Sequence, residues 1–281
     1  MSFLHNFQPE SILFTLGPIT IYWYGLFMVI SIILALIITT HLAKRYDLKP
    51  SLIIDLAFWL ILFGFIGARL YELIIDFDYY YQNPLAIVKI WQGGLAIHGA
   101  IITGLITLYL FSKNLREKLS QSTINIFWKL TAIIVPGLAL GQAVGRWGNY
   151  FNQELFGLPS NLPWAIPITL FYRPIEYISI NFFHPTFLYE SIGCLIIFIV
   201  LMIYHKKIKN QINPIKHFIR ITALYLLLYS VLRFSLEFLR LDPTLTIFNW
   251  RWPQIISIIL ILISIYLFFI SRKHEKDIQT N

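Results

Sequence analysis

The chain has 281 residues, of which 57% are hydrophobic and only 13% are charged, and its formal net charge is +8. A mean hydropathy of +0.68 is atypical of a soluble globular domain and indicates a membrane protein. Membrane topology and anionic lipid headgroups explain the excess positive charge, so membrane lipids are expected partners and nucleic acid is not.

Seven apolar runs follow one another along the chain, and each is long enough to predict a membrane-spanning helix. They cover 19–41, 52–73, 93–111, 124–144, 187–204, 218–237 and 253–270. The first run has no basic region before it and is too long for a cleaved signal peptide, so we expect it to be retained. The expected fold class is all-α: one polytopic membrane domain over residues 1–281.

Lysine and arginine residues between these runs are distributed unequally. With the N-terminus outside, four of them fall in outer segments, namely Lys89, Arg173, Arg240 and Arg251. Thirteen fall in cytoplasmic segments: Lys44, Arg45, Lys49, Lys113, Arg116, Lys118, Lys206, Lys207, Lys209, Lys216, Arg272, Lys273 and Lys276. Because basic residues accumulate in cytoplasmic loops, we expect the N-terminus outside and the C-terminus in the cytoplasm.

Three arginines, Arg69, Arg146 and Arg233, lie at the predicted outer ends of the second, fourth and sixth runs. Further polar residues are predicted at the same level of the membrane: Tyr22, Tyr24, Glu72, His98, Glu154, Glu190, Glu237 and Arg240. A charged group at this depth costs a few kcal/mol. Interfacial anchoring through structural ion pairs is one interpretation. A polar pocket open to the outer leaflet is the other, and the number of contributing helices favours it.

The residue types at this level predict an anionic ligand, because guanidinium groups bind phosphate through paired hydrogen bonds and the abundant anion there is a phospholipid headgroup. Segment 145–157, GRWGNYFNQELFG, adds asparagines that suit hydroxyl groups. It opens a stretch, 145–186, expected to form an ordered extracytoplasmic cap. His98 is a candidate proton carrier, with a structural hydrogen-bonding role as the alternative. The other histidines lack the spacing of metal ligands, so no metal is expected.

Segment 145–157 resembles the signature of the bacterial prolipoprotein diacylglyceryl transferases. Five further segments are similar to that family in order and spacing: YWYGL (22–26), GARLYE (67–72), GGLAIHGA (93–100), HPTFLYES (184–191) and LRFSLEFLR (232–240). The resemblance spans essentially the whole chain. Two positions depart from the family pattern. Ala132 stands where members often carry an acidic residue, and Ala100 replaces a glycine.

The resemblance implies an enzyme of the bacterial inner membrane with its active site toward the outer leaflet. Such enzymes transfer the diacylglyceryl group of phosphatidylglycerol to the lipobox cysteine of a prolipoprotein signal peptide, the first step of lipoprotein maturation. The products are a thioether and glycerol-1-phosphate, and no cofactor is implied.

By the same resemblance, Arg146 matches the phosphatidylglycerol-binding arginine, Arg233 a second essential arginine, and His98 the proposed catalytic histidine. Tyr24, Asn149 and Gly157 fall on essential positions, and Glu154, Glu190 and Glu237 fall on acidic ones. The predicted site is therefore catalytic at Tyr24, His98 and Arg233. It is substrate-binding at Arg69, Arg146, Asn149, Asn152, Glu154, Gly157, Glu190, Glu237 and Arg240.

Three other functions fit the sequence less well than the transferase does. A secondary transporter would place polar groups near the bilayer midplane and show repeated halves, and no repeat is visible in the sequence. A seven-helix receptor or retinal protein is the second alternative, and retinal binding would need a lysine in 253–270, which contains none. A scaffold without catalysis would be expected to lose the signature arginine or asparagine, and Arg146 and Asn149 are both present.

Overall fold

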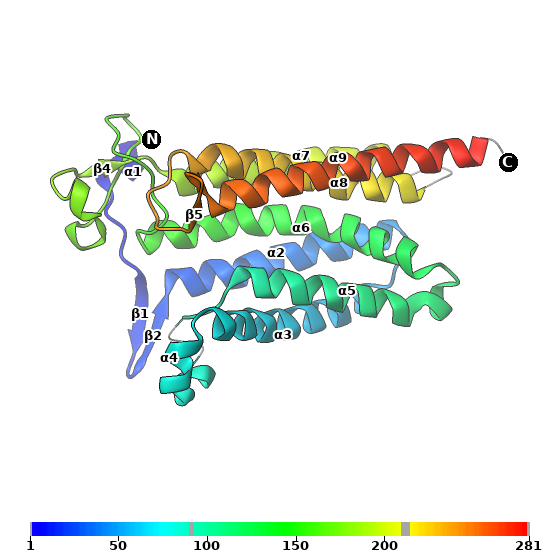
Figure 1. Ribbon diagram of the computed structural model, residues 1–281, viewed down its shortest axis with the longest axis horizontal. Helices are drawn as coiled ribbons and strands as arrows, with labels where there is room; N and C mark the ends of the chain where they lie inside the picture. Colours follow the sequence, from blue (N-terminus) through cyan, green and yellow to red (C-terminus); the bar gives the residue numbers. More distant parts are fainter. Residues whose placement is uncertain (1, 90–92, 209–213, 280–281) are drawn as a thin grey trace. The chain divides into compact units, whose positions relative to one another are not determined.

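The computed structural model describes residues 2–89, 93–208 and 214–279, shown as a ribbon in Figure 1. Lys209, one of the predicted cytoplasmic basic residues, lies outside the described residues. The chain forms two compact units. Unit 1 comprises residues 1–38 and 132–281, and unit 2 comprises residues 39–131.

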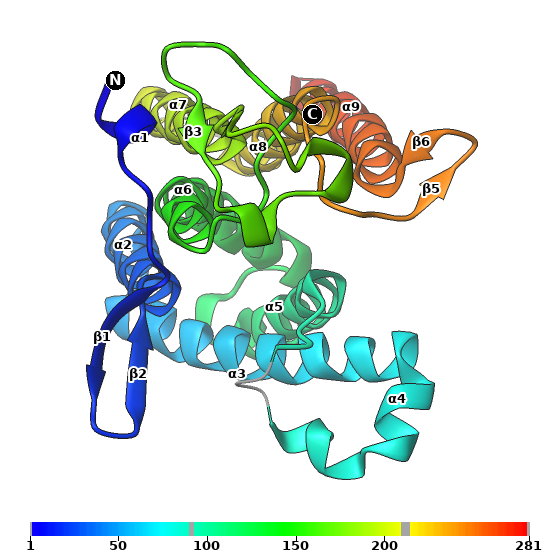
Figure 2. The ribbon, with the colours of Figure 1, turned by 90° about the vertical axis from the view of Figure 1, so that its left-hand side faces the viewer.

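Unit 1 is built mainly from long helices joined at one end by ordered loops. Its helices and strands are α1 (Ser2–Asn6), β1 (Ile12–Leu16), β2 (Ile19–Tyr22), most of α2 (Trp23–Arg45), most of α6 (Thr123–Phe151), β3 (Ile166–Pro167), the 3-10 turns η3 (Leu170–Tyr172) and η4 (Ile175–Tyr177), β4 (Phe182–Phe183), α7 (Thr186–Lys207), α8 (Pro214–Glu237), β5 (Thr246–Ile247), β6 (Trp250–Arg251) and α9 (Trp252–Gln279). Helices α7 and α9 both pack against α8, as Figures 1 and 2 show.

Unit 2 is a helix pair with an appended helical turn. It contains α3 (Pro50–Ile75), α4 (Phe77–Gln82), the 3-10 turn η1 (Pro84–Val88) and α5 (Ile97–Leu119). Helices α3 and α5 lie side by side in Figure 2. Their backbones approach closely because both carry glycine at the crossing, where a Cβ on Gly99 would lie 2.7 Å from the carbonyl carbon of Gly67.

Each of the seven predicted spans overlaps a helix, and the prediction of an all-α polytopic membrane protein is confirmed. The first four residues of the first span, 19–22, instead form strand β2. Six helices in the described part of the chain are long and apolar enough to cross a membrane: α2, α3, α6, α7, α8 and α9. Helix α5 is not among them. It begins at Ile97, four residues after the predicted start, and ends in the polar stretch SKNLREKL. The inside–outside orientation stays a prediction.

Helix α6 is longer than its apolar run. It passes through Pro136 and ends at Phe151, so the first seven residues of the segment assigned to the cap, 145–151, are helical. The rest of that segment holds η3, η4 and the paired strands β3 and β4, in which Ile166 lies opposite Phe183. A buried cluster joins these strands to α6 and α7 through Tyr150, Ile166, Ile168, Phe183 and Phe187.

Burial follows the pattern expected of helices that meet lipid. Apolar side chains on the outer faces of the helices remain exposed, such as Ile33, Ile54 and Leu262. Several charged residues are instead buried, among them Glu190, Glu237 and Arg240. The single cysteine of the sequence, Cys194 in α7, is also buried. Buried charges require partners of opposite charge or hydrogen bonds. In unit 1 these charges lie where the loops 152–185 and 238–251 adjoin the ends of the helices.

Candidate active site

Glu190, the fifth residue of α7, joins two arginines from different parts of unit 1. Its Oε1 lies 2.7 Å from Nη2 of Arg146 in α6, and its Oε2 lies 3.6 Å from Nη1 of Arg240 after α8. Tyr229 of α8 donates to the same Oε1 at 3.3 Å. The neighbouring Ser191 donates to the carbonyl of Ala143 at 2.7 Å, and this bond holds α7 against α6 next to Glu190. Three helices therefore orient one buried carboxylate.

Glu237, the last residue of α8, joins a second pair of arginines. Its Oε2 lies 2.8 Å from Nη1 of Arg233, one helical turn earlier, and its Oε1 accepts a hydrogen bond from Nε of Arg251 at 2.7 Å. Within the described residues, neither of the two facing atoms has a hydrogen-bond partner, so the Arg233 contact is an ion pair without hydrogen-bond alignment. Arg251 is thus the hydrogen-bonding partner of this carboxylate in the described part of the chain.

Asp242 connects the two groups into one series. Its Oδ1 accepts from Nε of Arg240 at 2.7 Å, and its Oδ2 lies 3.8 Å from Nη2 of Arg251. We call the result the ion-pair chain. In order, it runs Arg146, Glu190, Arg240, Asp242, Arg251, Glu237 and Arg233. Each carboxylate lies between two guanidiniums.

The ion-pair chain carries a net positive charge and has a partly exposed guanidinium at each end. It contains four guanidiniums and three carboxylates, so one positive charge is not neutralised within it. The side chains of its terminal members, Arg146 and Arg233, are 21% and 17% exposed, whereas those of Glu190 and Glu237 are 2% and 0% exposed. The accessible groups at both ends are therefore cationic, an arrangement suited to a phosphate.

The signature segment extends the site beyond Arg146. Nη1 of Arg146 donates to Oδ1 of Asn149 at 3.3 Å, and Nδ2 of Asn149 donates to Oε1 of Glu154 at 2.6 Å. Asn152 lies in the turn after α6, where its backbone N–H bonds to the carbonyl of Gly148. Tyr24 packs its ring on Gly148, since a Cβ there would lie 2.9 Å from Cδ2 of Tyr24.

Gly157 has a packing role that its position in the sequence did not reveal. Its N–H bonds to the carbonyl of His184 at 2.9 Å, and it forms a β-bridge with Arg240. A Cβ at this position would lie 2.9 Å from the carbonyl oxygen of Leu239 and from side-chain atoms of His184 and Thr186. The missing side chain lets the signature segment lie against the backbone that carries Arg240.

Arg69 and His98 both belong to unit 2, and Arg69 is fully engaged there. Its guanidinium donates to the carbonyls of Ala86, Ile87, Gly93 and Gly94 and to the Tyr80 hydroxyl. It also lies over the Tyr80 ring, 4.9 Å from the centroid. The predicted substrate contact of Arg69 would require these bonds to be exchanged. His98 is the second residue of α5, with its ring 5.8 Å from that of Tyr71.

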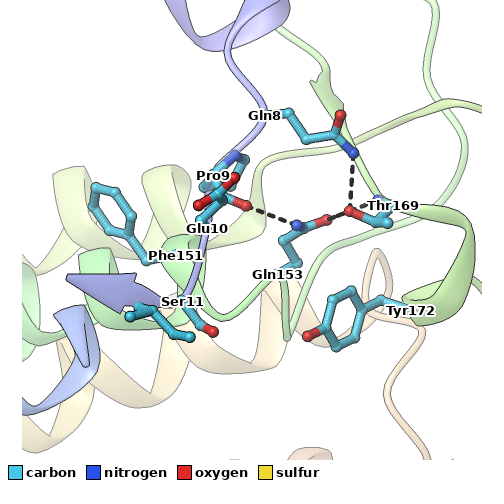
Figure 3. A pocket seen from close by; sticks show the side chains of 9 residues that line it. Gln8, Pro9, Glu10, Ser11, Phe151, Gln153, Thr169 and Tyr172 are labelled. Atoms are coloured by element: carbon cyan, nitrogen blue, oxygen red, sulfur yellow. Dashed lines mark hydrogen bonds between the residues drawn. The ribbon is translucent and has the colours of Figure 1, made fainter. Parts of the chain in front are cut away.

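A cavity of about 470 Å³ adjoins the end of the signature segment (Figure 3). Gln153 bridges it. The Gln153 side chain donates to the carbonyl of Pro9 at 2.8 Å and accepts from the N–H and hydroxyl of Thr169, both at 2.7 Å. None of the predicted site residues lines this cavity. The ion-pair chain, rather than this cavity, therefore defines the candidate site.

The structure brings most of the predicted site residues in unit 1 together and adds three that the sequence did not single out. The residues brought together are Tyr24, Arg146, Asn149, Glu154, Gly157, Glu190, Arg233, Glu237 and Arg240. The added ones are Tyr229, Asp242 and Arg251. The sequence signal for Asp242 and Arg251 was weak, consisting of charges placed just before and after apolar runs.

Comparison with known proteins gives the chain its family. The sequence profile described as "Prolipoprotein diacylglyceryl transferase" matches residues 11–270. The chain is 40% identical over 254 residues to a protein of Synechococcus elongatus, with 90% of this chain and 84% of the relative covered. It is 39% identical over 252 residues to one of Nostoc sp., covering 89% and 85%.

A third relative, from Prochlorococcus marinus, is 37% identical over 300 residues, covering 98% of this chain and 96% of its own length. All three relatives carry the name "Phosphatidylglycerol–prolipoprotein diacylglyceryl transferase". The resemblance noted from the motifs is thereby confirmed. The chain is a multi-pass membrane protein and belongs to the prolipoprotein diacylglyceryl transferase family.

Proposed function

We propose that this protein transfers the diacylglyceryl group of phosphatidylglycerol to the lipobox cysteine of prolipoproteins. The reaction takes place in the bacterial inner membrane, at the outer leaflet. Family membership supports the reaction. The single observation that carries the assignment of the site is the ion-pair chain, whose terminal guanidiniums are accessible while its two glutamates are buried.

The proposed chemistry is a displacement at carbon. The thiolate sulfur of the prolipoprotein cysteine bonds to C3 of the diacylated glycerol, and the bond from C3 to the phosphate oxygen breaks. The bonding electron pair leaves with the oxygen, so glycerol-1-phosphate departs with one more negative charge than the diester carried. Arg146 and Arg233 stabilise that charge, because fixed cations lower the barrier where charge develops.

The thiol must lose its proton, because the thiolate is the nucleophile and an unperturbed cysteine has a pKa of about 8.5. His98 is the proposed proton acceptor, with Tyr24 assisting, on the strength of the family resemblance. Asn149, Asn152 and Glu154 are proposed to bind headgroup hydroxyls. Glu190, Glu237 and Arg240 hold the two phosphate-binding arginines in place. Gly157 keeps the signature segment against Arg240.

The test uses purified protein in detergent micelles with phosphatidylglycerol and a lipobox peptide. Mass spectrometry should detect a peptide heavier by one diacylglyceryl group, with release of an equal amount of glycerol-1-phosphate. Replacing the peptide cysteine by serine, or phosphatidylglycerol by phosphatidylcholine, should abolish the product. Turnover that persists with the serine peptide would refute the reaction. Uptake of a labelled solute into proteoliposomes, without any adduct, would favour a transporter instead.

A further inference from the structure

We propose that Arg251 is a positioning residue for the transfer reaction. In this inference, which rests on the proposed function, Arg251 acts through Glu237 to hold Arg233 ready for the leaving phosphate. Arg251 lies in β6, outside the family motifs that the sequence displays, and its position in the sequence marks it simply as an outer-loop basic residue. Its contacts indicate a more specific task.

Arg251 is fixed from both its backbone and its side chain. Its backbone N–H donates to Oε1 of Gln254 at 3.0 Å. Its guanidinium donates to the carbonyl of Arg240 at 2.9 Å and to that of Asp242 at 2.6 Å. The remaining guanidinium nitrogen, Nε, donates to Oε1 of Glu237 at 2.7 Å. The guanidinium therefore joins the end of α8 to the loop after it, in one fixed orientation.

The β5–β6 hairpin places Arg251 at this point. Thr246 lies opposite Arg251, and Ile247 lies opposite Trp250, so the turn is Phe248–Asn249. Both turn residues have positive φ, 49° and 66°, as a two-residue hairpin with the favoured twist requires. This tight turn returns the chain to α8, which explains how residue 251 meets residue 237.

Glu237 depends on Arg251 for its orientation. The glutamate side chain is 0% exposed, and its contact with Arg233 has no hydrogen-bond alignment. The hydrogen bond from Arg251 therefore sets the plane of the carboxylate, and the carboxylate in turn sets where the Arg233 guanidinium rests. A buried carboxylate without its donor would turn toward Arg233 and pull that side chain with it.

Arg251 also affects how much positive charge Arg233 offers to a ligand. Glu237 shared between two guanidiniums leaves the group of three with a net charge of +1. Without Arg251, Glu237 and Arg233 would form a neutral pair, and their attraction for a phosphate would fall. Both effects act on the lipid phosphate and neither acts on the thiol, which gives the inference a distinctive kinetic signature.

The experiment compares Arg251→Gln, Arg251→Lys and a matched control, Arg173→Gln. Arg173 also braces a loop, by donating to the carbonyls of Ile168 and Ile178, but it has no part in the ion-pair chain. Arg251→Gln should lower kcat/KM for phosphatidylglycerol by roughly 10- to 100-fold while the KM for the peptide stays within about twofold. Arg251→Lys should recover part of the loss, because it restores the charge but not the fork. Arg173→Gln should stay within about twofold of wild type.

A double-mutant cycle with Glu237→Gln separates positioning from loop support. The losses from Glu237→Gln and Arg251→Gln should not multiply, because both changes break the same contact. Multiplying losses, equal losses in Arg251→Gln and Arg173→Gln, or an unchanged Arg251→Gln enzyme would each overturn the inference.

A binding measurement keeps the inference testable if the wild-type protein produces no adduct, which would refute the proposed transferase activity by itself. Glycerol-1-phosphate should raise the Tm of the wild-type protein and raise that of Arg251→Gln clearly less, because ligand binding stabilises the folded state. Equal rises in the two proteins would refute the role of Arg251.

Discussion

Arg146 is held by two neighbours that leave its outer side accessible. Asn149 accepts from one terminal nitrogen and Glu190 pairs with the other, while the side chain stays 21% exposed. A guanidinium held in this way can meet a phosphate without first reorganising, which is the condition under which a fixed charge assists catalysis. Lysine offers a point charge without the planar fork, so it cannot satisfy Asn149, Glu190 and a ligand in the same geometry.

We therefore expect Arg146→Ala to lower kcat about 10²- to 10³-fold and Arg146→Lys to restore little of that loss. The measurement is the rate of diacylglyceryl transfer to a lipobox peptide at saturating phosphatidylglycerol. Arg173→Ala serves as the control, since it removes an arginine that donates to the backbone carbonyls of Ile168 and Ile178. Full activity of Arg146→Lys would show that charge alone suffices at this position.

Among the elements, the signature segment is positioned by close backbone packing. Gly157 lies against Leu239, His184 and Thr186 with no room for a methyl group. The next residue, Leu158, donates to the carbonyl of Leu239 at 2.7 Å. The segment that follows Asn149 and Glu154 is thereby tied to the strand-like residues that carry Arg240, so a shift in one moves the other.

Gly157→Ala should reduce transfer activity at least about tenfold and lower the Tm, because overpacking displaces backbone that supports the ion-pair chain. Gly104→Ala is the matched control. A Cβ on Gly104, in α5, would meet nothing within 4 Å, and alanine favours a helix. Thermal unfolding followed by tryptophan fluorescence, together with the transfer assay, distinguishes the two variants. Normal activity and Tm in Gly157→Ala would contradict the packing argument.

Unit 2 allows a second paired comparison, at the loop held by Arg69. Gly93 and Gly94 both have positive φ, 92° and 73°. A Cβ on Gly94 would lie 2.5 Å from both Nη1 of Arg69 and the Tyr80 hydroxyl, whereas a Cβ on Gly93 would meet nothing within 4 Å. Alanine at either position strains the backbone, but only alanine at 94 also displaces Arg69.

Gly94→Ala should therefore lose clearly more activity than Gly93→Ala, by about tenfold or more. The reason is that the hydrogen bonds from Arg69 hold the backbone of Gly93 and Gly94, shortly before His98 in the chain. The transfer rate of the two variants, measured side by side, tests this. Equal losses would mean that backbone strain alone matters and that the Arg69 contacts do not.

The sequence predicted the helices well and their ends less well, for a physical reason visible in α6. Long apolar runs locate spans because lipid admits backbone only when its polar groups are paired within the segment. The apolar run ends at 144, where a segment with Arg146, Asn149 and two glycines begins, and glycine and asparagine are poor helix formers. The helix continues because these glycines allow α2 to approach, with Tyr24 packed on Gly148 and Ser31 near Gly145. Tertiary packing here overrides local propensity.

The same reasoning explains which site residues could be predicted. Arg146, Glu190, Arg233 and Glu237 stood out because a charge inside an apolar run is costly and needs an explanation. Arg251 did not stand out, because its importance comes from a hairpin that folds it back onto Glu237, fourteen residues earlier. The hydrophobic periodicity of a sequence does not show that a hairpin will bring Arg251 next to Glu237.

At the scale of the whole molecule, the distribution of basic residues predicts the orientation in the membrane. The single cysteine is buried, so it should contribute little labelling, and introduced cysteines can be detected above it. Asn161→Cys, in the loop after α6, should react with a membrane-impermeant maleimide in intact cells. Gln121→Cys, between α5 and α6, should react only after permeabilisation. The reverse pattern would invert the topology and place the ion-pair chain at the cytoplasmic face.

An enzyme that attaches lipid to sulfur faces the hazard of becoming its own acceptor. This chain has one sulfhydryl, four positions beyond Glu190 on α7, and no part of Cys194 reaches the surface. The packing around Cys194 keeps its sulfur from reaching the glycerol carbon that would be attacked. We therefore expect that Cys194 does not become alkylated and does not compete with the substrate thiol for the diacylglyceryl group.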